Sequence, residues 1–386
     1  MELVKPDTYI DFMRVRKPVL GVSLVLVALS VISLFYPGPN FGIDFTGGTE
    51  IQLPFKGDVS SSEVRSALEA AGFSRPQVVA VGEAGAEYMI QVRESEVASS
   101  TQLSAVESGI KAAVSSELLG FSVSPSGDKV SLTFREDIDP TTLGAPFVSQ
   151  GLAVRDAVRL GGGSREDFRY EVFLSGMADK VVASLTEALG ERGPETPRRV
   201  EWVGPKAGAQ LRSAGLQSLL YAIAFIMLYV AFRFDLRFAP GGVIAMLHDA
   251  LITLGIFVLV RKEVNLTTVA ALLAIIGYSI NDTIVVYDRI RENISRHRKR
   301  TFIDIINLST SQMLSRTLVT SMTTILSVVA FLFLGAGVLQ DIAFALIVGV
   351  AVGTFSSVYI AAPTTEWIDR RFFRRSIAKQ RAQAAA

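Results

Sequence analysis

The sequence predicts an α-helical membrane protein with six transmembrane helices and an α+β domain inserted after the first of them. Its 386 residues have a mean hydropathy of +0.39, which is unusually high for a soluble domain. Charged residues are clustered, so that long apolar stretches carry none. The segment between the first two apolar stretches, residues 37–212, is charged throughout and contains an internal repeat with an α+β pattern.

Six stretches are long and apolar enough to cross a membrane. Five contain no Asp, Glu, Lys or Arg; they are residues 18–43, 213–232, 264–281, 317–340 and 342–365. The sixth, residues 238–260, is as apolar but contains His248 and Asp249. A spanning helix needs about 20 apolar residues. We therefore predict transmembrane helices over 18–36, 213–232, 239–260, 266–287, 313–334 and 340–362.

The first apolar stretch has two interpretations. It follows Arg14, Arg16 and Lys17, as either a membrane anchor or a signal peptide would. Its apolar run of about 19 residues is longer than the usual hydrophobic region of a signal peptide, and no A-x-A-like cleavage site follows in residues 35–40. We therefore expect a retained anchor.

The basic residues favour one orientation in the membrane. Lys and Arg are concentrated before span one, between spans two and three, between spans four and five, and after span six. With six spans these four regions share one side, which the positive-inside rule makes the cytoplasm. We thus predict a cytoplasmic N-terminus (1–17), a cytoplasmic loop (288–312), a cytoplasmic tail (363–386) and a domain on the far side (37–212).

The domain contains a repeat. Residues 48–82 align without a gap with residues 127–161, and matched pairs include Leu53 with Leu132 and Phe55 with Phe134. The two copies span about 48–125 and about 127–204. In each copy the sequence pattern predicts the order βαββαβ, which is that of a ferredoxin-like domain. A chance match between two unrelated α+β segments is the alternative, but a gapless alignment favours duplication.

Charged residues within the spans are the most informative candidates for function. Asp282 lies about 8 Å inside span four at 1.5 Å per residue, and Arg316 lies at a similar depth in the antiparallel span five. Buried charges normally pair or line a polar path. An Asp whose Arg neighbour moves in and out of reach could load and release a proton. The alternative is a static pair that fixes helix packing.

The residues around Asp282 favour the proton-path interpretation. Gly277, Tyr278, Ser279, Asn281 and Thr283 place small or polar groups on a spanning helix, which suits a hydrated seam better than a lipid-facing surface. We include Asn281 with Asp282 and Arg316 in the predicted path.

A second polar pair interrupts span three. His248 and Asp249 lie about 12 Å inside that span by the same helical rise. A neutral His that donates to a neighbouring polar group is the usual explanation for such a pair. A role in the proton path is the alternative that we keep for both residues.

Composition excludes several other functions. The chain has 38 Lys and Arg against 37 Asp and Glu, so no basic excess suggests nucleic-acid binding. The absence of Cys excludes disulfides, thiol catalysis, zinc–thiolate sites and iron–sulfur clusters. Two His residues leave little for a His-based metal centre. With no Ser/His/Asp set and no paired carboxylates, we predict no enzyme, no metal and no cofactor.

Four motifs in order closely resemble the SecF family of bacterial protein-export subunits. They are FGIDFTGGT from Phe41, WVGPKAGAQL from Trp202, IIGYSINDTIVVYDRIREN from Ile275, and RTLVTSMTT from Arg316. Together they cover the spans and their flanks. The motif residues that we single out are Phe41, Gly42, Asp44, Gly47, Gly48, Gly204, Pro205, Gly277, Asp288, Arg289, Thr317, Thr320 and Ser321.

The resemblance implies a function and a set of partners. SecF proteins belong to the resistance-nodulation-division superfamily, pair with SecD, assist the SecYEG channel, and use the proton-motive force to complete preprotein export across the inner membrane. YajC and YidC are further partners, beside the preprotein and the lipid bilayer. Asp282 and Arg316 match the positions implicated in proton movement, and a further membrane Asp would come from SecD. The far-side domain would then be periplasmic.

One departure from the family and two alternatives stay open. A typical SecF has a single small periplasmic domain, so the repeat leaves open which copy contacts preprotein. The first alternative function is a half-transporter of the same superfamily that exports small lipophilic molecules. The second is a scaffold that holds the channel and insertase together without transporting anything itself.

Overall fold

The computed structural model describes residues 8–81, 86–93, 98–124, 127–160, 167–234, 236–335 and 337–373. The chain divides into two compact units, which we call the helical bundle (1–41 and 212–386) and the α+β domain (42–211). The ends of the predicted repeat, Gly82 and Gly161, lie outside the described residues, as do residues 1–7 and the tail from Arg374 onward.

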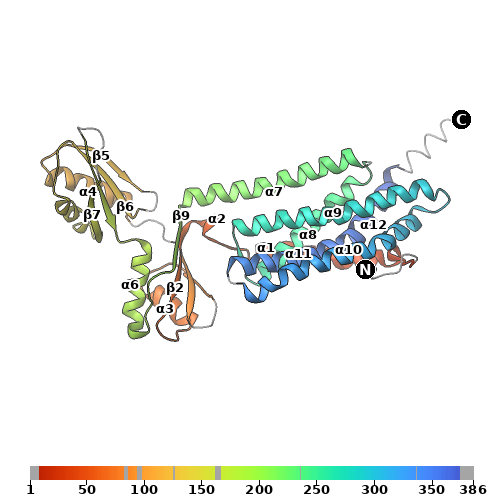
Figure 1. The fold of residues 1–386 in the computed structure, drawn as a ribbon, viewed down its shortest axis with the longest axis horizontal. Helices are drawn as coiled ribbons and strands as arrows, with labels where there is room; N and C mark the ends of the chain where they lie inside the picture. The colour runs from red at the N-terminus through yellow and green to blue at the C-terminus, as the bar shows by residue number, and fades with distance from the viewer. Residues whose placement is uncertain are drawn as a thin grey trace. The chain divides into compact units, whose positions relative to one another are not determined.

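Six helices in the described part of the chain are long and apolar enough to span a membrane, which confirms the predicted number of spans. They are α1 (Arg16–Phe35), α7 (Pro205–Arg233), α8 (Ala239–Leu259), α9 (Leu266–Arg296), α10 (Phe302–Leu334) and α11 (Val338–Ser356). A π-helical stretch (Ser357–Ala361) joins α11 to α12 (Ala362–Ile368). Figure 1 shows these helices, from red α1 to blue α12.

The segment 288–312, expected as a loop, is helical except for residues 297–301. On α9, Glu292 forms ion pairs of 2.5 Å with Arg289 and 2.6 Å with Arg296, one turn away on either side. On α10, Thr301 and Asp304 form a capping box that starts the helix. The helices α9 and α10 therefore extend beyond the apolar stretches from which the spans were predicted.

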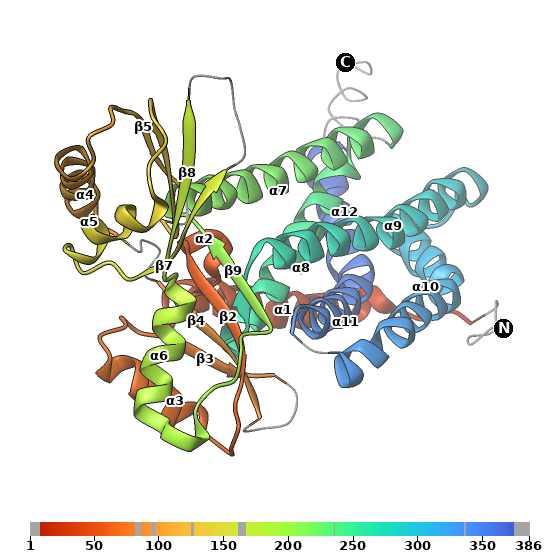
Figure 2. The same ribbon diagram turned by 60° about the vertical axis from the view of Figure 1, so that its left-hand side comes forward.

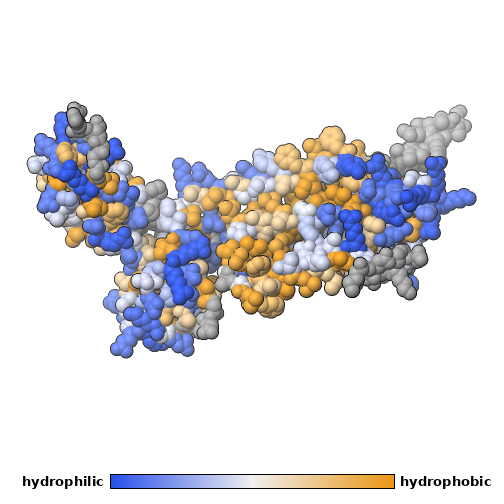
Figure 3. Space-filling model, viewed as in Figure 1, coloured by the Kyte–Doolittle hydropathy of each residue, from blue (hydrophilic) through white to orange (hydrophobic). Residues whose placement is uncertain are grey.

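The bundle is packed around α8, α9 and α11. In the most apolar window of each helix, 61% of α8 residues are buried, against 11% for α7 and 11% for α10. Tyr287 of α9 is fully buried against the rings of Phe234 and Phe238, and its hydroxyl lies 2.9 Å from Thr365 Oγ1. Figure 3 shows hydrophobic residues over the outer face of the bundle, as expected for helices that face lipid.

A short parallel pairing closes one end of the bundle. β1 (Asn40–Phe41) pairs with β10 (Glu263–Val264), which follows α8. Arg261 donates a hydrogen bond of 3.0 Å from Nη1 to the carbonyl oxygen of Gly38. This pairing places Phe41, the first residue of the Phe41–Thr49 motif.

The α+β domain contains two four-stranded antiparallel sheets. The first has the strand order β3-β4-β2-β9 and contains β3 (Gln77–Ala80), β4 (Glu87–Val92), β2 (Gly48–Pro54) and β9 (Arg199–Val203). One face is covered by α3 (Ser61–Ala70) and α6 (Met177–Leu189), whose buried Val64, Leu68, Val181 and Leu185 complete the core. Figure 2 shows these elements.

The second sheet has the order β5-β6-β8-β7 and contains β5 (Leu118–Val123), β6 (Lys129–Phe134), β8 (Phe168–Leu174) and β7 (Val154–Leu160). Its core is completed by α4 (Ser100–Ala113) and α5 (Gly144–Val148), with Val106, Ile110 and Phe147 fully buried. The order of elements along the chain is the one that the repeat predicts.

The two sheets do not coincide with the two copies. β5, the last strand of the first copy, pairs with β6 of the second copy, and β9, the last strand of the second copy, pairs with β2 of the first. Only residues 124–128 separate β5 from β6, so a local hairpin closes at a lower entropic cost than pairing with β2, more than 60 residues away in sequence. Each sheet therefore takes its last helix and strand from the other predicted copy.

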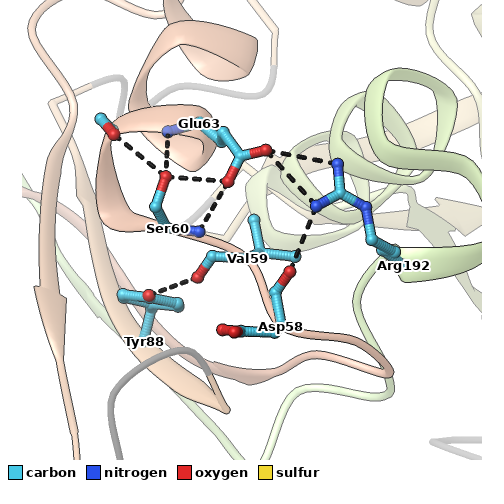
Figure 4. Close-up of polar contacts among 7 residues, drawn as sticks. Asp58, Val59, Ser60, Glu63, Tyr88 and Arg192 are labelled. Carbon is cyan, nitrogen blue, oxygen red and sulfur yellow. Dashed lines mark hydrogen bonds and ion pairs between the residues drawn. The ribbon is translucent and has the colours of Figure 1, made fainter.

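The exchanged helix α6 is tied to α3 at its end, as Figure 4 shows. Arg192, which follows α6, donates from Nη1 to the carbonyl oxygen of Asp58 at 3.1 Å and lies 3.3 Å from the Glu63 carboxylate. Glu63 also accepts a hydrogen bond from the backbone N–H of Ser60, its helix cap, at 2.8 Å. Tyr88 of β4 donates to the carbonyl oxygen of Val59 at 2.5 Å. These bonds fix the turn between β2 and α3.

Candidate functional site

Asp282 lies in the interior of the bundle, on a helix whose start is well defined. Asn265 caps α9 by accepting the backbone N–H of Thr268 at 2.9 Å. Asp282 is 3% exposed, and Ser321 of α10 lies 3.5 Å from its Oδ2. The same Ser321 hydroxyl lies 2.6 Å from Thr354 Oγ1 of α11. A chain of hydroxyls thus connects the carboxylate to two neighbouring helices.

Arg316 is on α10, the helix that follows the one carrying Asp282. Its positive charge acts on the Asp282 carboxylate through space. Among the ion pairs of the described residues, none joins Arg316 to a carboxylate within 4.0 Å. The two residues are therefore neighbours without direct contact. Asn281, the third residue of the predicted path, is exposed on α9.

His248 and Asp249 form the centre of a second buried polar cluster. Asp249 is 0% exposed and accepts hydrogen bonds from Ser279 of α9 at 2.5 Å and from Ser356 of α11 at 2.7 Å. The Nδ1 atom of His248 lies 2.9 Å from Asp249 Oδ1, while its buried Nε2 has no hydrogen-bond partner among the described residues. The cluster therefore joins α8, α9 and α11.

The two buried carboxylates differ in how well they are hydrogen-bonded. Asp249 has three partners within 2.9 Å, whereas Asp282 has Ser321 at 3.5 Å. Hydrogen bonds from the protein therefore hold the Asp249 carboxylate more firmly than the Asp282 carboxylate.

Small residues allow the helices around this site to approach closely. A Cβ atom at Gly353 of α11 would lie 3.0 Å from Ser279 Cβ, and one at Gly349 would lie 2.4 Å from Ile275 Cδ1. Because glycine has no Cβ atom at these positions, α11 can pack closely against α9.

The sequence analysis did not single out Thr354 or Ser356. Their hydroxyls lie within an apolar stretch, which was the available signal.

The two motifs that flank the α+β domain meet at its base. Gly42 precedes the short helix α2 (Ile43–Thr46), which contains Asp44. A Cβ atom at Gly47 would lie 2.8 Å from Pro205 Cα, and one at Gly208 would lie 2.9 Å from Gly47 N. The remaining motif glycines are also tight, because a Cβ at Gly48 would lie 2.4 Å from Val92 O and one at Gly204 would lie 2.8 Å from the Trp202 ring. The glycines are thus required for backbone packing.

The motif residues beyond Asp282 continue along α9 and α10. Arg289 donates from Nε to Gln312 Oε1 at 2.7 Å and so joins the two helices, whereas Asp288 is exposed. The Thr320 hydroxyl donates to the backbone one turn earlier, and the buried Thr317 hydroxyl has no hydrogen-bond partner in the part of the chain that the structure describes. Gly277 is exposed, with no atom within 4 Å of a Cβ built there.

The described residues contain no group of three or more His, Asp or Glu that could hold a metal ion. The described part of the bundle instead contains buried hydroxyls and carboxylates, with guanidinium groups near them. Such groups bind and release protons or fix helix contacts.

Family models match at both ends of the domain. Residues 183–371 match the C-terminal region of the SecD/SecF protein export membrane proteins, and residues 32–59 match the SecD/SecF GG motif. The second match contains Gly47 and Gly48, so it covers the close backbone contact described above.

Curated relatives match along nearly the whole chain. The protein translocase subunit SecF of Vibrio alginolyticus is 34% identical over 361 residues, which cover 94% of this chain and 90% of the relative. The SecF subunit of Magnetococcus marinus is 35% identical over 384 residues and is covered to 99% in both chains.

Two solved structures of SecDF are also similar to this chain. The crystal structure of SecDF from Thermus thermophilus, a translocon-associated membrane protein, has a TM-score of 0.64 and 30% identity over 96% of this chain. This chain spans 40% of the length of that protein. A SecDF structure in the super-membrane-facing form has a TM-score of 0.58 and 31% identity. The chain is a multi-pass inner-membrane protein, and it belongs to the SecD/SecF family of protein-export membrane proteins.

Proposed function

We propose that this chain is the SecF subunit of the Sec translocon accessory complex, and that with SecD it uses the proton-motive force to drive or complete preprotein translocation. Relatives of nearly the same length are named protein translocase subunits, which is a transport function. The observation that carries the proton step is Asp282, a buried carboxylate with one long hydrogen bond and a positive charge nearby.

In this proposal the proton switches the contact between α9 and α10. The ionised Asp282 attracts Arg316 and accepts from Ser321. Protonation removes the negative charge, so the attraction to Arg316 is lost and Ser321 is free to bond Thr354 alone. Because Thr354 is on α11, the change reaches three helices. Repeated protonation and release would rock these helices and move the attached domain.

In this proposal, Asn281 and the His248–Asp249 pair assist the proton path but do not carry the proton. Asn281 precedes Asp282 and is exposed, where it can hydrogen-bond water at the edge of the path. Asp249 reaches α9 through Ser279, one helical turn before Asp282. We propose that this cluster holds α8, α9 and α11 together while α10 moves.

We further propose the orientation and partners that the sequence indicates. Both termini and the α9–α10 connection are cytoplasmic, and the α+β domain is periplasmic, since Lys and Arg are concentrated on the first side. SecD is the principal partner in this proposal, because the matched SecDF protein is longer and this chain spans 40% of its length. The SecYEG channel, YajC, YidC and the preprotein are further partners.

The α+β domain is, in this proposal, a duplicated ferredoxin-like domain whose copies exchanged their last helix and strand. The aromatic pairs support duplication: Phe55 and Tyr88 meet edge to face at 5.6 Å, and Phe134 and Tyr170 do so at 5.8 Å. The register agrees as well, because Leu53 lies opposite Tyr88 and Leu132 lies opposite Tyr170.

The test is the replacement Asp282→Asn in the chain assembled with SecD. We expect assembly to be retained and the stimulation of preprotein export by a proton gradient to be abolished, whereas Asp282→Glu keeps part of it. Export is measured in membrane vesicles with and without a protonophore, and assembly by co-purification of SecD. Full proton-stimulated export by Asp282→Asn would refute the proposal.

A further inference from the structure

A polar pocket lies in the bundle between the ends of α7, α9 and α10. Its volume is about 290 Å³. At about 30 Å³ for each water molecule in the liquid, it has room for roughly ten waters. Its lining includes Arg233 of α7, Val285 and Asp288 of α9, and Arg316 of α10.

The pocket reaches from the end of the bundle to the level of the buried carboxylate. Along α9 its lining runs from Ile284 to Glu292, a length of about 12 Å at 1.5 Å per residue. Ile284 is two residues beyond Asp282, which is about 3 Å along the helix axis. Arg316 connects the pocket to Asp282, because it lines the pocket and its charge also acts on the Asp282 carboxylate.

The charges of the lining favour water as the occupant. Glu292 is neutralised by Arg289 and Arg296, and the Arg233 guanidinium lies 5.3 Å from the Phe234 ring centroid. Asp288 is in no ion pair within 4.0 Å among the described residues. Charges of both signs are costly to place against acyl chains, so a pocket lined by Arg233, Asp288 and Arg316 retains water.

We propose that this pocket is the water-filled opening through which Asp282 exchanges its proton with the solution, and that Asp288 receives that proton on the way. In the release step the Asp282 carboxyl group transfers its proton to pocket water, the Asp288 carboxylate accepts it, and Asp288 then returns it to the solution. The uptake step is the reverse. This inference rests on the proposed function, because it takes Asp282 as the proton carrier.

Water in the pocket is tested by cysteine labelling, since the chain contains no Cys. Val285→Cys places a thiol on the lining, and Leu228→Cys is the matched control, because Leu228 is 51% exposed beside the lining residue Tyr229 but does not line the pocket. Each variant is assembled with SecD in inverted and right-side-out vesicles and treated with a membrane-impermeant maleimide.

We expect Val285→Cys to react at least about tenfold faster than Leu228→Cys from the cytoplasmic side, because the reactive thiolate forms only in water. Equally slow reaction of both variants, as a pocket filled by lipid or by SecD would give, overturns the inference. Labelling of Val285→Cys only from the periplasmic side overturns it too.

The role of Asp288 is tested by Asp288→Asn and Asp288→Glu. We expect Asp288→Asn to slow proton-driven export by about tenfold or more, with a changed pH profile, and Asp288→Glu to restore most of the rate. Parent rates in Asp288→Asn overturn the relay, even where Asp282→Asn blocks export. Parent rates in Asp282→Asn would instead refute the proposed function, whatever the labelling result.

Discussion

The Ser279 hydroxyl of α9 donates a hydrogen bond of 2.5 Å to the Asp249 carboxylate of α8, deep inside the membrane-spanning bundle. Ser279 is one helical turn before Asp282 on the same helix. The bond therefore connects the well-hydrogen-bonded carboxylate of the bundle to the helix that holds the poorly bonded one. It ties α9 to α8 at that level, which agrees with the proposal that α10 moves against a fixed α9.

Loss of this cluster is expected to destabilise the bundle. Asp249→Ala leaves buried His248 and two hydroxyls without their acceptor and should lower stability by about 3–5 kcal/mol. Ser279→Ala removes one bond to a carboxylate and should cost about 1.5–3 kcal/mol. Thermal unfolding in detergent measures both. Thr323→Ala, an exposed hydroxyl deletion on α10, is the control and should stay within about 0.5 kcal/mol of the parent.

Replacement of Arg316 distinguishes the proposed proton-coupled function from the alternative of a scaffold that transports nothing itself. Arg316→Ala should slow proton-driven export by about tenfold, which corresponds to roughly 1.4 kcal/mol of lost stabilisation, because the charge that acts on Asp282 is removed. Arg316→Lys keeps a charge and should recover part of the rate. Arg296→Ala removes an exposed arginine from the end of α9 and controls for net charge. Export by Arg316→Ala at the parent rate would favour the scaffold alternative.

Much of this architecture could be predicted from the sequence, because apolar length and charge spacing are local properties. The six spans and the order of elements in the α+β domain followed from them. The pairing of β9 with β2 could not be predicted, because more than 140 residues separate the two strands and no local pattern indicates that they meet. The hydroxyl of Ser356 is 107 residues from Asp249, and no local pattern indicates that they meet. The direct role of Asp282 and Arg316 in proton movement stays a prediction.

The stability of the α+β domain should depend on pH through Glu50 of β2. Burial raises the pKa of Glu50 above its ordinary value of 4.5, with the Glu201 charge adding to the effect. The folded state therefore binds this proton more tightly than the unfolded state, and the parent loses stability as the pH rises from 4.5 through the folded pKa. Glu50→Gln removes that loss, so it should be more stable than the parent at pH 7.

The Glu50→Gln prediction is checked by thermal unfolding of the full chain between pH 4 and pH 8. Trp202 of β9 is a local fluorescence probe, because Glu201 beside it pairs with Glu50, and Trp367→Phe removes the second of the two Trp residues. The gain of Glu50→Gln over the parent should shrink as the pH falls toward 4.5. A gain that is the same at every pH would show that Glu50 does not titrate on unfolding.

The backbone contact between the two motifs explains why Gly47 is required. Gly47 has φ +73°, and a Cβ there would lie 2.8 Å from Pro205 Cα, an atom that cannot move aside as a flexible side chain can. With ψ 167° as well, Gly47 lies in a backbone region that is essentially restricted to glycine, so Gly47→Ala should cost about 1–3 kcal/mol for the backbone conformation and about 1–3 kcal/mol more for the clash. Gly72→Ala is the matched control, because Gly72 has φ +92° with no atom within 4 Å of its Cβ position, so it should show the first cost alone. Denaturant unfolding followed by Trp202 measures the difference. If the two variants were equally stable, the α2 turn and the start of α7 would not be in contact.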